Sequence, residues 1–278
     1  MPLVHGFKLL RNVAIDRAYR SRRVDDLERF LADHADLAGK IIGVVIAFNR
    51  PRIIELLVTA VRRHVSDMEL LIFDNSRDPD ARSAIAGVCA DRDLPYLALP
   101  ANPVRHPNRS HAAALNWVYY NVVQRLRPRV FALIDHDLIP LKPISIAERI
   151  GDQPFFGYRV TGRFGWSMWA GYSMFDFSVA SRYPLDFGVD FPRNLDTGGR
   201  NYPVFFRHFD HRRYRFAPGG QLWLSDAKTG ASQRFAVYDE WLHFGGAAYS
   251  RIYVERLGLV ENLIERLAAG EDYHALTR

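Results

Sequence analysis

The sequence contains a single cysteine, Cys89, among its 278 residues. An internal disulfide is therefore excluded, as are metal sites built from paired cysteines. Ile85 and Val88 lie near this cysteine in an apolar segment that is predicted to be helical, so we expect a buried and unreactive thiol. Cysteine chemistry is thereby excluded as the basis of function.

Long apolar runs are also lacking. No stretch approaches the ~20 apolar residues that are needed to cross a bilayer. The first 23 residues are interrupted by Lys8, Arg11, Asp16 and Arg17, which is unlike a secretory signal. The composition, 48% hydrophobic and 24% charged, is that of a globular protein with one large or two small domains. We therefore expect a cytoplasmic protein.

Basic residues are in moderate excess, with 37 Lys and Arg against 31 Asp and Glu. This charge attracts nucleic acid, anionic lipid or a phosphorylated small molecule. The sequence lacks paired Cys and His ligands and an aromatic RNA-binding strand, so we expect no nucleic-acid partner and favour a phosphorylated ligand. The N-terminal segment mixes apolar and basic residues, which predicts a helix on the flank of its own domain; contact with an anionic membrane surface is the alternative.

Hydrophobic periodicity predicts a parallel α/β sheet between residues 40 and 140. We expect strands at 41–48, 69–73, 96–99 and 130–134, and helices at 51–64, 80–90 and 111–126, the last of them capped by Ser110. An amphipathic helix is predicted at 249–269, and we assign it no part in the chemistry.

Each predicted strand ends in polar residues, namely Asn49, Asp74, Asn102 and the pair Asp135 and Asp137. Because open α/β sheets bind ligands at the carboxyl ends of their strands, we expect these side chains to surround one crevice. Asp135 and Asp137 share a face of an extended chain and suit a divalent cation, although an Asp-X-Asp turn is the alternative. A glycine-rich phosphate loop is lacking, so a bound metal must carry the phosphate charge.

Four segments in this order resemble the nucleotide-sugar-binding half of a GT-A glycosyltransferase of the family 2 type. They are Ala47-Phe48-Asn49-Arg50-Pro51, Phe73-Asp74-Asn75-Ser76, Asn102 with 110–116, and Asp135-His136-Asp137. The resemblance implies a mostly parallel α/β sheet that is flanked by helices. It divides the chain into an N-terminal helical extension (1–39), a nucleotide-sugar-binding half (40–140), an acceptor-binding and catalytic half (141–248) and a C-terminal helical segment (249–278).

The resemblance also implies roles for the polar strand ends. Asn49 and Asp74 would hold the nucleoside, with Asn102 beside them in the donor crevice. Asp135 would face the ribose or the metal, and Asp137 would bind Mn²⁺ or Mg²⁺ directly, where the ion bridges the diphosphate.

Two further segments of the second half carry candidates. The segment 165–171 resembles the part of these enzymes that lies beneath the donor sugar, which makes Trp169 and Gly171 candidate donor contacts; packing in the core is the alternative for the tryptophan. His243 precedes two glycines and is the candidate third metal ligand, because imidazole suits Mn²⁺; a structural histidine is the alternative.

Asp196 is the candidate general base. It lies in Asn194-Leu195-Asp196-Thr197-Gly198-Gly199, where inverting family 2 enzymes place theirs, and a plain turn is the alternative. Asp190 and Asp239 are the reserves, and retaining chemistry stays open.

The function predicted from the sequence is metal-dependent transfer of a single hexose from a UDP- or GDP-sugar to a hydroxyl acceptor, a glycan or a lipid-linked molecule. The Gln-X-X-Arg-Trp segment of processive members is absent, which favours one transfer per encounter. The alternatives are a sugar nucleotidyltransferase, which normally begins with a glycine-rich loop, and a catalytically degenerate carbohydrate-binding or scaffold module.

Overall fold

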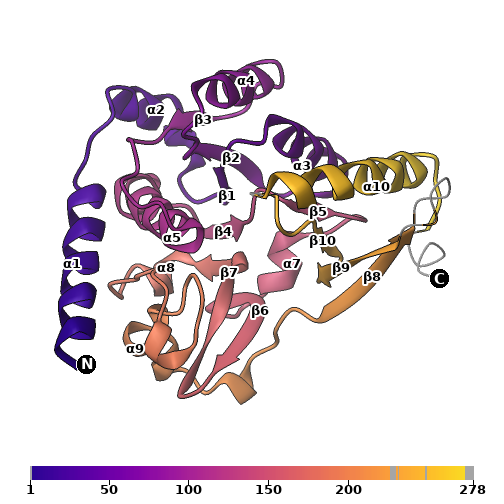
Figure 1. The fold of residues 1–278 in the computed structure, drawn as a ribbon. Helices are drawn as coiled ribbons and strands as arrows, with labels where there is room; N and C mark the ends of the chain where they lie inside the picture. The colour runs from indigo at the N-terminus through magenta and orange to yellow at the C-terminus, as the bar shows by residue number, and fades with distance from the viewer. Residues whose placement is uncertain (1, 226–229, 231, 248, 273–278) are drawn as a thin grey trace.

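The computed structural model describes residues 2–225, 230, 232–247 and 249–272 (Figure 1). The side chains of residues 2–10 lie outside the described set, and so does the predicted membrane contact through Phe7, Leu9 and Leu10.

A six-stranded sheet forms the centre of the molecule, in the order β3-β2-β1-β4-β7-β6. The strands are β1 (Ile41–Ala47), β2 (Glu69–Asp74), β3 (Tyr96–Ala98), β4 (Val130–Ile134), β6 (Phe155–Gly162) and β7 (Gly165–Asp176). The first four are parallel, and β7 and β6 are added antiparallel. The prediction of an α/β fold with a mostly parallel sheet is confirmed.

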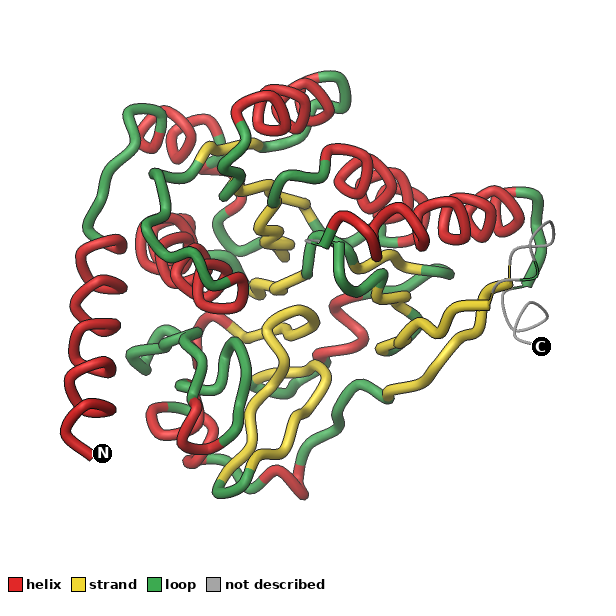
Figure 2. The backbone as a smooth tube through the Cα atoms, in the orientation of Figure 1, coloured by secondary structure: helices red, strands yellow, loops and turns green. Residues whose placement is uncertain are grey.

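Helices cover both faces of this sheet (Figure 2). The apolar side chains of β1 alternate between two cores, as expected for a strand that is buried on both sides. One core contains α5 (Pro107–Val118) and α2 (Leu27–Asp33), and the other contains α3 (Pro51–His64) and α4 (Pro79–Ala90). Residues far apart in sequence thus build one continuous support beneath the strand ends.

The start of α5 differs from the prediction. The helix begins at Pro107, because a proline in the first turn needs no amide partner, and it continues through a π-helical stretch (Tyr119–Val123) into α6 (Gln124–Leu126). Ser110 is therefore inside the helix, where it is buried, and it is not a cap.

A second, antiparallel sheet has the order β5-β10-β9-β8. Its strands are β5 (Leu138–Pro140), β8 (Gly219–Ser225), β9 (Ser232–Tyr238) and β10 (Trp241–His243). The helix α10 (Ser250–Ala268) packs on it through Val260 and Leu263. Because β5 follows β4 after three residues, the segment 135–137 connects the two sheets.

Short elements complete the chain and fall below the length at which periodicity predicts a helix. They are α7 (Ile146–Ile150), α8 (Phe177–Ala180), α9 (Asn201–Val204) and the 3₁₀ turns Ala35–Leu37, Phe191–Arg193, Phe206–His208 and His211–Arg213.

The N-terminal helix α1 (Pro2–Arg20) runs along one side of the molecule and contacts α5 (Figure 1). The buried ring of Tyr19 fixes its end, because its hydroxyl donates to the carbonyl of Pro100 over 3.1 Å. Among the described helices, none combines the length and apolar character that spanning a membrane requires.

Candidate metal centre and adjoining pocket

Asp135, Asp137 and His243 converge where the two sheets meet. One potential ligand atom from each lies within 4.8 Å of the others. Asp135 directly follows β4, and its amide donates to the carbonyl of Gly171 over 2.8 Å. His243 is brought there by strand pairing, because β10 runs antiparallel to β5 with His243 opposite Leu138. The strand register therefore sets the position of all three side chains.

Asp137 is the most tightly held of the three. Its side chain is buried, its Oδ1 lies 3.3 Å from Nε2 of His243, and its Oδ2 accepts from the amide of Gly245 over 3.0 Å. The turn that supplies this amide contains Gly245 and Gly246 at φ angles of 65° and 78°, which favour glycine strongly. The two glycines after His243 are thus required by the backbone of the turn.

The electrostatics of the pair suit a cation site. Burial opposes ionisation of Asp137, but the charge and hydrogen bond of His243 outweigh it and hold the pKa of this carboxyl far below its usual range. Burial lowers the pKa of His243, and Asp137 more than compensates, so the net shift is upward. The site thus concentrates negative charge that a proton on His243 or a metal ion can balance. Two carboxylates with one imidazole form a donor set that Mn²⁺ accepts, and the carboxylates suit Mg²⁺.

A pocket of about 220 Å³ opens beside this cluster. Its apolar wall comes from the end of β1, and its polar wall comes from the segment after β2, the start of α5 and the turn after β10. The lining residues that matter below are Ile46, Phe48, Asn75, Arg77, Arg105, Asn108, His111 and Tyr249, with the three candidate ligands. The pocket therefore combines an apolar surface, two arginines and the anionic cluster.

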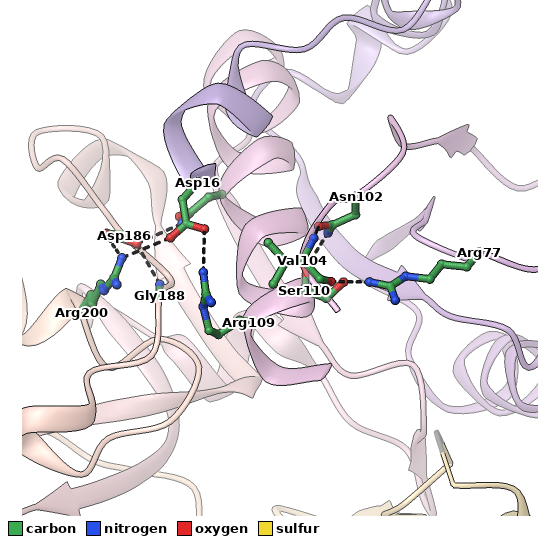
Figure 3. Close-up of polar contacts among 10 residues, drawn as sticks. Asp16, Arg77, Asn102, Val104, Arg109, Ser110, Asp186, Gly188 and Arg200 are labelled. Atoms are coloured by element: carbon green, nitrogen blue, oxygen red, sulfur yellow. Dashed lines mark hydrogen bonds and ion pairs between the residues drawn. The ribbon is translucent and has the colours of Figure 1, made fainter. Parts of the chain in front are cut away.

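The first turn of α5 is held from the side of the donor crevice (Figure 3). The amide group of Asn102 donates to the carbonyl of Ser110 over 3.0 Å and to the side chain of Asn75 over 3.1 Å. The guanidinium of Arg77 donates to the carbonyl of Val104. These bonds fix the polar wall of the pocket.

The opposite side of the same turn is held by charges (Figure 3). Asp16 of α1 lies 3.7 Å from Arg109 and 3.4 Å from Arg200, and Arg200 lies 3.5 Å from Asp186. The N-terminal helix therefore braces both α5 and the loop that contains Asp196.

His111 and His136 line the pocket and were missed in the sequence. Burial lowers the pKa of His111, although Asp135 opposes the shift, so the ring is neutral near pH 7. The ring Nδ1 of His136 lies 3.2 Å from the carbonyl oxygen of Ile46. A histidine at the first turn of a helix gives no sequence signal of its own, so only the fold could identify His111.

Asn49, Asp74 and Asn102 shape the loops and are not among the described residues that line the pocket. Asn49, at a φ of 51°, accepts from the amide of Arg77 over 2.9 Å. Asp74 is fully buried and accepts from Ser76 over 2.7 Å and from the hydroxyl of Tyr96 over 2.9 Å. Direct contact of these residues with a nucleoside stays a prediction.

Trp169 and Gly171 lie behind His243. The ring centroids of Trp169 and His243 are 4.8 Å apart. A Cβ atom on Gly171 would lie 2.2 Å from Cζ2 of Trp169, so only glycine leaves space for this ring. Both residues thus support the candidate ligands, and their contact with a donor sugar stays a prediction.

Asp196 is exposed at the rim of the pocket, where it accepts from the side chain of Asn108 over 2.8 Å. Its charge also acts on His111. The reserves are engaged elsewhere: Asp190 pairs with Arg193 at 2.7 Å, and Asp239 is buried beside Tyr172 and Arg149. Of the three aspartates, Asp196 alone lies beside the lining residues of this pocket.

Comparison with known proteins gives only distant structural likenesses. No protein-family model matches the chain, and no curated protein matches it. A Pyrobaculum calidifontis mannosyltransferase, PcManGT, solved with GDP-Man and Mn²⁺, matches with a TM-score of 0.38 at 13% identity, over 62% of this chain and 55% of its own. TarS of S. aureus matches with a TM-score of 0.28 at 17% identity, over 37% of this chain and 18% of its own.

Glucosyl-3-phosphoglycerate synthase from Mycobacterium tuberculosis, solved with Mn²⁺ and UDP-glucose, matches with a TM-score of 0.30 at 18% identity, over 49% of each chain. The chain thus spans about half or less of these solved proteins. The matches agree with the GT-A resemblance of the sequence. At TM-scores below 0.5 they carry no weight for activity or ligand, for which the site geometry is the basis.

Proposed function

We propose that this protein is a metal-dependent glycosyltransferase that moves a single sugar from a nucleotide-sugar donor to a hydroxyl acceptor. The observation that carries the proposal is the convergence of Asp135, Asp137 and His243 on the wall of a pocket at the carboxyl edge of the sheet. This is the edge at which open α/β sheets bind their ligands.

The three side chains hold Mn²⁺ or Mg²⁺, which supplies charge neutralisation to the departing diphosphate. Arg77 and Arg105 line the same pocket and add positive charge near the phosphates. Ile46 and Phe48 offer an apolar surface to the base, and Asn75 offers its amide to polar groups of the nucleoside. The donor is a UDP- or GDP-hexose in this proposal.

Asp196 accepts the proton of the acceptor hydroxyl in the inverting form of this mechanism. Its exposed carboxylate lies at the pocket rim, and the hydrogen bond from Asn108 orients it. Neutral His111, inside the rim, is available as a hydrogen-bonding group for donor or acceptor. The acceptor is a glycan or a lipid-linked hydroxyl compound, and transfer is non-processive, in a cytoplasmic protein that associates at most peripherally with membranes.

Calorimetry with UDP, GDP and their sugars, with and without Mn²⁺, tests the proposal. We expect binding that Mn²⁺ strengthens and that Asp137→Ala abolishes, whereas the exposed Asp80→Ala leaves it unchanged. A donor hydrolysis screen then identifies the sugar, and NMR coupling constants of the product give its anomeric configuration. If the wild-type protein binds no nucleotide in the presence of metal, the transferase proposal is wrong and a scaffold role is favoured.

A further inference from the structure

Arg256, in the second turn of α10, reaches the turn that follows His243. Its Nη1 donates to the carbonyl oxygens of Phe244 and Gly245, the second over 3.1 Å, and its Nη2 donates to the carbonyl of Arg234 over 3.1 Å. The guanidinium carbon lies 4.7 Å from the ring centroid of Phe235. One arginine thus ties the helix, β9 and the ligand-bearing turn together.

The same turn holds Asp137 from its other side. The amide of Phe244 donates to the carbonyl of Asp137 over 2.9 Å, and the amide of Gly245 donates to its carboxylate over 3.0 Å. The carbonyl of Phe244 and the amide of Gly245 belong to one peptide group, whose C=O and N–H point in opposite directions. Arg256 and Asp137 therefore bind opposite edges of the same peptide plane.

This arrangement is polarised in one direction. A cation at the carbonyl oxygen and an anion at the amide hydrogen both align with the peptide dipole, so each hydrogen bond strengthens the other. The turn also needs such a restraint, because Gly245 and Gly246 have positive φ angles and glycine is free to adopt other conformations. A Cβ atom on Gly245 would lie 3.0 Å from Nη1 of Arg256, so the turn rests directly on the guanidinium.

Arg256 is separated from the donor pocket. It is not among the described residues that line the 220 Å³ pocket, and instead it lines a cavity of about 250 Å³ with His243 and Gly245. A change at Arg256 therefore leaves the walls of the donor pocket in place and reaches the ligands only through the turn.

We propose that Arg256 is a positioning residue for the metal centre: it orients the Phe244–Gly245 peptide so that Asp137 and His243 keep a common focus. The inference rests on the proposed metal-dependent function and extends it to α10, to which the sequence analysis gave no part in the chemistry. It predicts that the metal affinity of the protein depends on a side chain that touches neither metal nor donor.

The test compares Arg256→Gln and Arg256→Lys with the wild-type chain by titration with MnCl₂ alone and with MnCl₂ plus UDP or GDP. We expect Arg256→Gln to weaken Mn²⁺ binding about 10- to 100-fold, the range for groups that orient metal ligands. Arg256→Lys should restore part of the loss, because an ammonium donates to the carbonyl but lacks the planar fork. Nucleotide affinity without metal should not change.

Arg251→Gln is the matched control, since Arg251 lies on the same helix, is exposed and pairs only with Glu255 among the described contacts. It should bind Mn²⁺ like the wild type. Unchanged Mn²⁺ affinity in folded Arg256→Gln, even with a lower Tm, would leave a purely structural role and overturn the inference. If that variant does not fold, unchanged affinity in Arg256→Lys overturns it equally. If wild-type protein binds no Mn²⁺, the proposed function and this inference both fail.

Discussion

The carboxylate of Asp137 and the imidazole of His243 lie 3.3 Å apart, Oδ1 to Nε2, although they come from the crossover between the sheets and from the last strand. Their proximity raises the pKa of His243 against the effect of burial. In the same pair, His243 keeps Asp137 ionised in a buried position. The histidine therefore contributes both charge balance and a nitrogen ligand, and the two roles can be separated by substitution.

His243→Phe should weaken Mn²⁺ binding at least about 10-fold, because a ligand atom is lost while an aromatic ring still packs on Trp169. Mn²⁺ titration measures the affinity, and thermal unfolding shows whether the packing survives. His208→Phe is a matched control, because His208 is exposed and away from the cluster. Equal metal affinity in wild type and His243→Phe would remove the histidine from the ligand set.

Gly171→Ala should destabilise the protein by about 1–3 kcal/mol, because the new Cβ overlaps the ring of Trp169 and pushes it against His243. Chemical denaturation measures the free energy of unfolding. Gly258→Ala is the opposite case: this exposed position in α10 has no atom within 4 Å of the new Cβ, so we expect stabilisation by about 0.5–1 kcal/mol. Equal effects of the two changes would contradict the packing argument.

Asp16→Lys should lower the free energy of unfolding by about 2 kcal/mol or more, since it places a third cation against Arg109 and Arg200. The side chains of all three residues are only 19% exposed, so water screens the repulsion weakly. For a chain of this size the expected fall in Tm is several degrees. Asp33→Lys, at an exposed site, is the control; a comparable loss there would show that net charge alone is responsible.

Cys89 should not react with Ellman's reagent at pH 8 in the folded protein. Burial raises the pKa of its thiol to about 12, so the reactive thiolate is scarce until far above this pH. In the unfolded chain the pKa returns toward its ordinary value and labelling should be complete. Asp80→Cys supplies an exposed thiol as a positive control. Rapid labelling of native Cys89 would show that the α4 core opens readily.

The strands of the parallel sheet were predictable because each is a short apolar run with polar residues at its end. β1 and β4 were located to within one residue, and α3 begins at the expected Pro51. The aspartates at 135 and 137 were recognisable for the same reason, since two carboxylates at the tip of a buried strand are costly without a partner.

The residues that line the pocket after β2 were harder to predict because side chains alternate along a strand. The strand extends to Asp74, whose side chain faces inward toward Tyr96, and the lining positions fall to Asn75 and Arg77. Which residue faces the crevice depends on where pairing ends, and composition alone does not set that end.

Arg256 was unpredictable for a different reason. It contacts the turn through backbone carbonyls, which every residue carries, so no sequence pattern marks the partner. Only the packing of α10 against the second sheet brings the two together.

The crossover at 135–137 has a mechanical consequence. Asp135 ends a strand of the parallel sheet, whereas His243 belongs to the antiparallel one, so an ion shared between them acts as a rivet across the seam. Occupancy of the site and cohesion of the two halves of the molecule then rise and fall together, and a chelator would leave the seam as the first place for a protease to enter.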